Sequence, residues 1–290
     1  AAATYNRVIG RIAADATTID TSTTLTSFSG SSIRSVASTD GSKFWASGGN
    51  SGVIFQGLGG SGNGTTVSSV TSSGNLTNLR NIGIFNNQLY VTSASGASRM
   101  LTVGTGVPET SGQTMTQLPG FPTTSPSSSP YGFFFADLDS GVAGVDTVYV
   151  ADNTANAIQK YSLVSGSWTA SGTATAAGVQ GLTGTISGTS VTLYATAAGS
   201  MSTITDSSGY NGSLSGAVTS RATPAANTAC TSGVLAPTCN DPGFSTSPTK
   251  FTEITLGDRL VTATSIDSAT GSCTRGTRIV SPSNKNGFCS

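Results

Sequence analysis

Apolar and polar positions alternate along short stretches of this chain, and clusters of turn residues separate the stretches. The segment "DTVYVADNTANAIQKYSL", residues 146–163, contains two such stretches around a polar turn. Alternation with a period of two predicts β-strands that bury one face, and the polar turn between them predicts a hairpin. No stretch carries apolar residues at helical spacing over a useful length. The pattern therefore predicts an all-β protein.

The same strand–turn–strand pattern recurs in four places, and each copy carries an aromatic residue in its first strand. These aromatic residues recur every ~45 to 60 positions, and they are Trp45, Tyr90, Tyr149 and Tyr194. One strand precedes each hairpin, as in "LRNIGIF" and "YGFFFADL", and a fourth follows it, as in "GSWTASGTA". Four short strands per repeat are typical of a β-propeller blade.

The two ends of the chain suggest how the ring closes. Residues 5–28 contain two strand patterns without an inner pair before them, whereas the unit from Phe251 has an inner pair and an outer part that the pattern does not define. A propeller removes exposed sheet edges when both termini build one blade. We expect one β-propeller domain over residues 1–290, with about five four-stranded blades, or six if residues 223–250 contribute another.

The low charge excludes two classes of partner. Only 9% of the residues are charged, and 13 basic residues balance 13 acidic ones. No basic stripe is present to neutralise a phosphate backbone, so nucleic acid is not an expected partner. No apolar run approaches the ~18 residues that a membrane-spanning helix needs, so no membrane span is expected.

All cysteines lie in the last quarter of the chain, at Cys230, Cys239, Cys273 and Cys289. Four cysteines allow three disulfide pairings, and we expect the local one, in which the first two pair and the last two pair. Clustered cysteines in a Ser/Thr/Gly-rich chain favour an oxidising compartment, hence a secreted, extracellular or cell-surface protein whose segment 223–290 is stapled by disulfides. The initial "AAAT" is similar to what cleavage at a small-residue site leaves. The alternative is a cytosolic protein with free thiols.

The repeat core also resembles a known family. The stretch "TVYVADNTANAIQKYSL" is similar to NHL-type propeller repeats, in which a "YVAD" strand is followed by an Asn and "IQ". The run over residues 5–229, with phrases such as "SPYGFFFADLD" and "GLTGTISGTSVTLYAT", resembles secreted bacterial propeller proteins that are mostly of unassigned function. The resemblance implies a propeller fold and an extracellular setting, and it supplies no catalytic residues.

The absence of histidine narrows the possible chemistry, because it removes Ser-His-Asp and Cys-His nucleophilic sites and His-based metal sites. The loop "ADLDSGVAGVD" is the strongest candidate site, since Asp137, Asp139 and Asp146 place three carboxylates in it. Ca²⁺ takes about six to eight oxygen ligands, so this loop is a candidate Ca²⁺ site. Alternatively, the carboxylates cap the turns of a long hairpin.

Two further sets of polar residues are candidates for function. Asp152 and Asn153 follow the next strand, at a position where some metal-dependent propeller hydrolases carry inward-facing acids, although turn capping is the simpler interpretation. Asn63, Asn75 and Asn211 lie in Asn-x-Ser/Thr sequons at turn-like places, so they are candidate N-glycosylation acceptors.

Together these features predict a secreted, non-catalytic structural or interaction protein, such as a matrix component, an adhesin or a surface-filament subunit. Its expected partners are further copies of itself, because an open sheet edge invites strand addition, or other extracellular surface components. The alternative is a cation-dependent propeller hydrolase, or a binder of small ligands or carbohydrate that uses the central channel or exposed aromatics such as Trp168. No cofactor other than Ca²⁺ is expected.

Overall fold

Strands and turns form the whole of the described structure. The computed structural model describes residues 5–123, 128–222, 228–229 and 239–240. No helix in this part of the chain is long and apolar enough to cross a membrane. The prediction of an all-β protein is confirmed.

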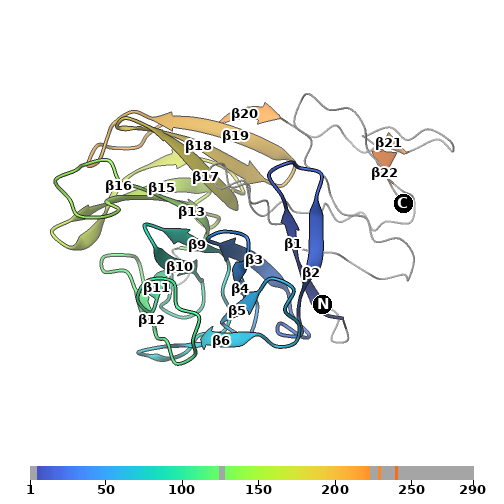
Figure 1. The fold of residues 1–290 in the computed structure, drawn as a ribbon. Coiled ribbons are helices and arrows are strands. Elements are labelled where there is room, and N and C mark those ends of the chain that lie inside the picture. The colour runs from blue at the N-terminus through green and yellow to red at the C-terminus, as the bar shows by residue number, and fades with distance from the viewer. Residues whose placement is uncertain (1–4, 124–127, 223–227, 230–238, 241–290) are drawn as a thin grey trace.

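Four sheets of four antiparallel strands follow one another along the chain, and we call them blades 1 to 4 (Figure 1). Blade 1 contains β3 (Ile33–Ser38), β4 (Lys43–Gly48), β5 (Val53–Gly57) and β6 (Thr65–Ser68). Blade 2 contains β9 (Ile82–Phe85), β10 (Gln88–Thr92), β11 (Met100–Val103) and β12 (Met115–Gln117). Blade 3 contains β13 (Pro130–Ala136), β14 (Thr147–Asp152), β15 (Ala157–Val164) and β16 (Ser167–Thr175). Blade 4 contains β17 (Gly181–Ser187), β18 (Ser190–Ala197), β19 (Ser200–Asp206) and β20 (Thr219–Ala222).

Smaller strands accompany these blades. The connection from blade 1 to blade 2 forms a short hairpin that extends the outer edge of blade 2, from β7 (Val70–Thr71) and β8 (Gly74–Asn75). A parallel pair lies near the end of the described residues, from β21 (Thr228–Ala229) and β22 (Cys239–Asn240).

The first strand of each blade lies innermost, and neighbouring blades meet there. Strand β3 contacts β9, and β13 contacts β17. Between blades 2 and 3 the hydroxyl of Thr92 donates a hydrogen bond to the carbonyl of Tyr131, at 2.8 Å. Sheets arranged in this radial order around inner strands form a β-propeller, so the predicted fold is confirmed (Figure 1).

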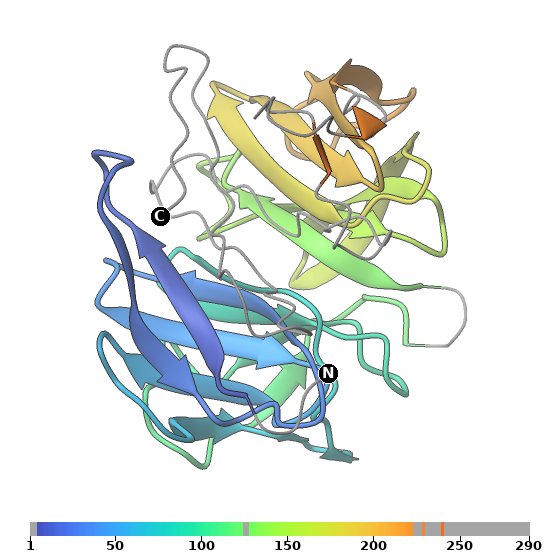
Figure 2. The same ribbon diagram turned by 90° about the vertical axis from the view of Figure 1, so that its right-hand side faces the viewer.

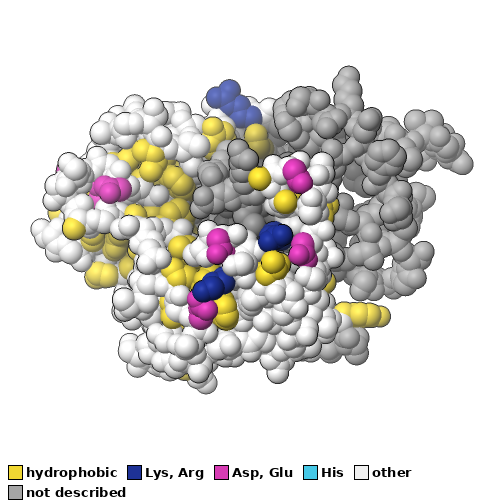
Figure 3. All heavy atoms as spheres, in the orientation of Figure 1, with side chains coloured by type: hydrophobic (Ala, Val, Ile, Leu, Met, Phe, Trp, Pro, Cys, Tyr) yellow, Lys and Arg dark blue, Asp and Glu magenta, His cyan; other side chains and the backbone are white. Residues whose placement is uncertain are grey.

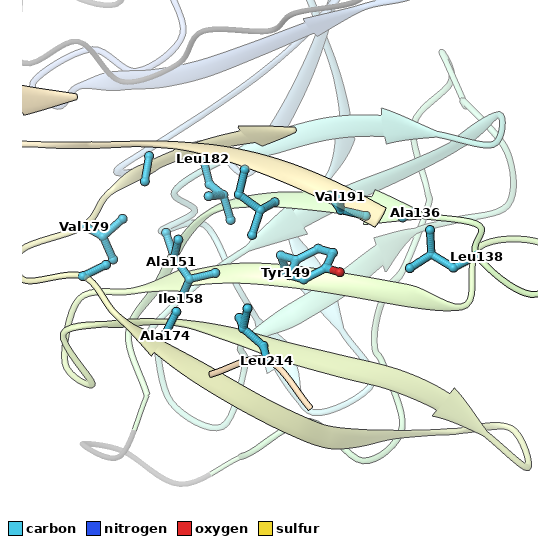
Figure 4. Packing of buried hydrophobic residues seen from close by; sticks show 13 residues of the cluster. Ala136, Leu138, Tyr149, Ala151, Ile158, Ala174, Val179, Leu182, Val191 and Leu214 are labelled. Atoms are coloured by element: carbon cyan, nitrogen blue, oxygen red, sulfur yellow. The ribbon is translucent and has the colours of Figure 1, made fainter. Parts of the chain in front are cut away.

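Blades 1 to 3 contribute apolar side chains from both of their faces. Every residue of β14 is buried, and its side chains alternate between two cores because successive residues of a strand point to opposite faces. Val148 and Val150 pack between blades 2 and 3, whereas Tyr149 and Ala151 pack between blades 3 and 4 (Figure 4). Burying one such side chain completely stabilises the fold by about 1.5–3 kcal/mol, so blades 1 to 3 are each held from two sides.

The N-terminal pair takes the place of a blade before blade 1. Strands β1 (Arg7–Ile12) and β2 (Ile19–Leu25) are antiparallel, and Ile9 and Leu25 pack against Phe44 and Ile54 of blade 1. The amide of Thr24 also donates to the carbonyl of Gly60, at 2.9 Å. The predicted strand pair in residues 5–28 is confirmed, and Figure 2 shows it lying along blade 1.

The aromatic anchors occupy equivalent strands, as the repeat predicts. Trp45, Tyr90, Tyr149 and Tyr194 all lie on the second strand of their blades. The first three are buried, but Tyr194 is only half-buried. Its side chain lies on the face of blade 4 that packs against no other described blade. The described residues supply four blades and one strand pair, and the strand patterns from Phe251 onward lie outside them.

Blade 3 receives a long loop from blade 4 at a position that only glycine tolerates. Gly172 in β16 forms a parallel bridge with Leu214, and the amide of Leu214 donates to the carbonyl of Ser171, at 2.8 Å. The φ of Gly172 is +99°, and a Cβ there would lie 2.2 Å from the carbonyl oxygen of Leu214. The loop therefore sits directly against the backbone of β16.

We expect Gly172→Ala to destabilise the protein by more than ~2 kcal/mol, because both the positive φ and the contact with Leu214 oppose a side chain. Gly166→Ala is the matched control, since Gly166 lies in the same blade at φ +80° with open space around it. That change costs about 1 kcal/mol of backbone strain. Equal losses for the two variants in urea unfolding would show that the docked loop does not constrain β16.

Candidate functional site

The predicted Ca²⁺ loop connects β13 to β14, and two of its carboxylates organise the loop itself. Asp146 is buried, and its Oδ2 accepts hydrogen bonds from the amides of Leu138, at 2.9 Å, and Asp139, at 2.6 Å. Asp139 in turn accepts the amide of Gly141, at 2.9 Å, and Asp137 is exposed. These bonds correspond to the turn-capping alternative, and Ca²⁺ binding by the loop stays a prediction.

Asp152 also serves its own loop. Its Oδ1 accepts three backbone amides, those of Ser129, Thr154 and Ala155, each at 3.0 Å, and its Oδ2 accepts the hydroxyl of Ser128, at 2.6 Å. Burial, with a smaller contribution from the charge of Asp152, raises the pKa of Tyr161 to about 12. The buried carboxylate of Asp152 is therefore fully occupied by donors, which agrees with the turn-capping interpretation.

The other predicted residues have different outcomes. The prediction that Trp168 is an exposed aromatic is wrong. Its side chain is only 5% exposed and packs edge-on against Phe121 and Phe135 in the core between blades 2 and 3. All three sequon asparagines are exposed, and glycosylation stays a prediction; they are Asn63, Asn75 and Asn211. The cysteines lie outside the described residues, apart from the backbone of Cys239 in β22, so their pairing stays a prediction.

One end of blade 2 holds buried nitrogen donors that the sequence analysis missed. Within the described residues, the buried side-chain atoms without a hydrogen-bond partner are Arg80 Nη1, Asn81 Nδ2, Arg99 Nε and Nη2, Gln117 Nε2 and Thr196 Oγ1. All but the last belong to this end of blade 2. Buried polar groups are almost always paired, so such a concentration is unusual.

Arg80 reaches blade 3 from just before β9. Its amide donates to the carbonyl of Thr92, and the amide of Asn81 donates to the hydroxyl of Thr92. The guanidinium of Arg80 lies over the ring of Tyr131, 3.8 Å from its centroid. In the sequence, the signal that could have revealed these groups was an arginine one or two residues before a buried strand, in "LRNIGIF" and "SRMLTV".

A second buried polar group joins blade 3 to blade 4. Nζ of Lys160 and Oδ2 of Asp206 lie 2.8 Å apart, with side-chain exposures of 0% and 2%. The hydroxyl of Tyr149 donates to the same oxygen, at 2.7 Å, and Lys160 also donates to the carbonyl of Gly212, at 2.8 Å. The lysine therefore holds the loop after β19 against blade 3, and no donor or acceptor of the pair is left for a substrate.

Hollows and acidic clusters of the kind that enzymes use are not found among the described residues. No group of three or more His, Cys, Asp or Glu side chains converges there as a metal site. Two hollows, beside Tyr194 and Val179, have room for only about 10 and 20 Å³, which is roughly the space of one water molecule. Small-molecule sites are usually ~300 to 1,000 Å³. Charged side chains are few on the face in Figure 3, and both signs are interspersed.

Comparison with known proteins does not assign the chain to a family. No protein-family model matches the chain, and no curated protein matches it. A solved protein from Lactobacillus plantarum is 13% identical over 69% of this chain and 59% of its own length, with a TM-score of 0.44. An extracellular domain from B. thetaiotaomicron is 14% identical over 61% of this chain and 21% of its own length, with a TM-score of 0.37. The β-propeller domain of Cps50 (Swd1) from Myceliophteria thermophila is 9% identical over 59% of this chain and 69% of its own length, with a TM-score of 0.33.

This chain thus spans 59% of the length of the first of these structures and about a fifth of the second. At such scores the likeness carries no argument about function, and the class rests on the four blades themselves: the chain is a β-propeller protein. The NHL-like and secreted-family resemblance is supported by its sequence motifs alone.

We expect Lys160→Met to destabilise the protein by about 3–5 kcal/mol, because it leaves the buried carboxylate of Asp206 without its cation. Lys43→Met is the matched control, since Lys43 pairs with Glu109 at the surface, where both side chains are nearly half exposed. The control should change the urea midpoint far less. Similar losses for both would contradict a special role of the buried pair.

The same pair predicts a pH dependence. Burial acts to raise the pKa of Asp206, but hydrogen bonds from Lys160, Ser208 and Tyr149 outweigh it and lower the pKa below its usual value. A lowered pKa stabilises the fold above the unfolded value of about 3.9, and the stabilisation is lost as the pH falls through the folded value. Urea midpoints between pH 6 and pH 2 should therefore fall less steeply for Asp206→Asn than for the wild type.

Proposed function

We propose that this β-propeller is a secreted, non-catalytic structural or interaction protein: a matrix component, an adhesin or a subunit of a surface filament. The observation that supports this most is that its carboxylates are already engaged in hydrogen bonds or ion pairs within the fold. Among the described residues, every carboxylate except that of Asp137 accepts a hydrogen bond from its own turn or belongs to an ion pair; these are Asp15, Asp20, Asp40, Glu109, Asp139, Asp146, Asp152 and Asp206. The chain has no histidine, so among the described residues Asp137 is the one carboxylate left that could act as a general base.

The compartment is proposed from the composition and the surface. A chain with 9% charged residues, clustered cysteines and exposed sequon asparagines is suited to the cell exterior. The exposed large apolar residues are scattered rather than gathered into one patch, namely Tyr5, Ile19, Leu58, Val70 and Ile186. A partner would therefore be held through backbone edges and hydroxyl-rich faces more than through a single apolar surface.

The face of blade 4 that packs against no other described blade is the proposed region of self-association. It carries Tyr194 and Thr196, which are half-buried, beside the buried residues Thr183 and Thr203. Strand β20 (Thr219–Ala222) is the outer strand of this sheet and pairs with no further strand among the described residues, and such an edge can pair with a second chain. Head-to-tail contacts of this kind give filaments when they do not close into a ring.

The test is electron microscopy and light scattering of the full chain purified without reductant, with thiols counted after denaturation. We expect assemblies larger than a monomer and no free thiols. Tyr194→Lys should dissociate the assemblies without unfolding the protein, whereas Tyr5→Lys, at the opposite end of the described chain, should not. A monodisperse monomer with a cation-dependent hydrolase activity that Asp139→Asn abolishes would overturn the proposal.

A further inference from the structure

The propeller has two distinct ends, because the first strands of its blades run in the same direction. Their starts lie together: Nη1 of Arg34, on β3, donates to the carbonyl of Leu79, shortly before β9, at 2.7 Å. The amide of Gly132, on β13, donates to the carbonyl of Gln180, directly before β17, at 2.8 Å. The turns that follow these first strands therefore lie together at the opposite end.

Acidic side chains gather at the end formed by these turns and by the loops between third and fourth strands, and we call it the acid end. The β1–β2 turn belongs to it, because Arg11 donates to the carbonyl of Gly41, at 3.3 Å. Six acids there are exposed or half-buried, namely Asp15, Asp20, Asp40, Glu109, Asp137 and Asp139. Among the described residues only Arg11 and Lys43 oppose them, since Lys160 is neutralised by Asp206 in the core.

Arginines gather at the opposite end, where the first strands begin, and we call it the arginine end. Five described arginines lie there, namely Arg7, Arg34, Arg80, Arg99 and Arg221. Asp152 is the one described acid at this end, and it is buried and bound to its own loop. Arg221 is exposed, whereas Arg34 and Arg80 are half-buried. Burial, with a smaller contribution from the charge of Arg34, lowers the pKa of Arg80.

The two ends are too far apart to neutralise each other in solution. The first strands contain four to seven residues, and a strand rises about 3.3 Å per residue, so the ends lie roughly 13–23 Å apart. The Debye length is only about 8 Å at physiological ionic strength. Each end therefore presents its own sign of charge to an approaching molecule.

We propose that copies of this chain stack along the propeller axis, with the acid end of one copy on the arginine end of the next. A second copy complements both ends, whereas a partner of a single sign would complement only one. Head-to-tail contacts of this kind leave one free end on each side, so they extend a filament. The stacking rests on the self-association proposed above and adds to it a contact on surfaces other than the face of blade 4.

The first measurement is sedimentation velocity of the full chain at pH 7, in sodium chloride from about 0.01 M to about 1 M, over which the Debye length falls from about 30 Å to about 3 Å. We expect the apparent dissociation constant of the assemblies to rise by at least about tenfold, because salt screens the contact. Assemblies of the same size at every salt concentration overturn the stacking, and so does a chain that is monomeric at the lowest one.

Two double variants then test the ends separately. Asp40→Lys with Asp137→Lys brings the acid end close to charge balance, and Arg34→Glu with Arg221→Glu does the same at the arginine end. Each variant alone should be monomeric, because one of its two ends has lost its charge. Arg34→Lys with Arg221→Lys is the matched control, since it keeps the charge and should assemble as the wild type does.

Mixing the two double variants provides a test that misfolding cannot imitate. The intact acid end of one variant can bind the intact arginine end of the other, so the mixture should form one-to-one pairs and nothing longer. Urea midpoints confirm that both variants are folded. A mixture that forms no pairs, or either variant assembling alone as the wild type does, overturns the stacking.

Tyr194→Lys separates this stacking from contact through blade 4. Assemblies that persist in high salt and in both double variants, and that dissociate only in Tyr194→Lys, leave the proposed function standing and overturn the stacking. Salt-dependent assemblies that Tyr194→Lys leaves intact support the stacking and contradict contact through blade 4. A monomer that binds poly-L-glutamate instead assigns the arginine end to an acidic partner and overturns the stacking as well.

Discussion

The fold depends on one constraint: a blade with two apolar faces must lie between two neighbours, and blades 1 to 3 are of this kind. Strand β14 shows this most directly, since Val148 and Tyr149 are adjacent in sequence and are buried in different cores. A sandwich of two sheets would cover only one face of each sheet, and the radial order of a propeller covers both. The N-terminal strand pair obeys the same rule, because it covers the face of blade 1 that blade 2 cannot reach.

Packing of this kind also buries polar groups, and the chain satisfies most of them with its own loops or with the neighbouring blade. Asp146 and Asp152 bind backbone amides of their own loops, and Lys160 binds carbonyls of the neighbouring blade. Carboxylates used in this way stabilise turns and are poor candidates for catalysis. The end of blade 2 differs, because its buried nitrogens exceed the acceptors near them.

Much of the architecture could be predicted because strand periodicity is a local signal. The four hairpins, their aromatic anchors and the preceding inner strands all lie where the alternation placed them. Trp168 was misplaced because "GSWTASGTA" defines a strand but not which of its faces is covered, and Phe121, distant in sequence, covers this one. The arginines were missed for a similar reason, since hydrophobic patterns treat a cation before a strand as an exposed residue.

The sequence by itself determined the strands, the four-strand repeat and the absence of imidazole chemistry, since each of these depends on neighbouring residues or on composition alone. Only the tertiary structure decided which carboxylates are already occupied, which nitrogens of Arg99 have no hydrogen-bond partner, and which face of blade 4 packs against no other described blade. The physical reason is that a hydrogen bond or a core contact joins residues tens of positions apart, such as Lys160 and Asp206. Their proximity exists only once the blades have packed.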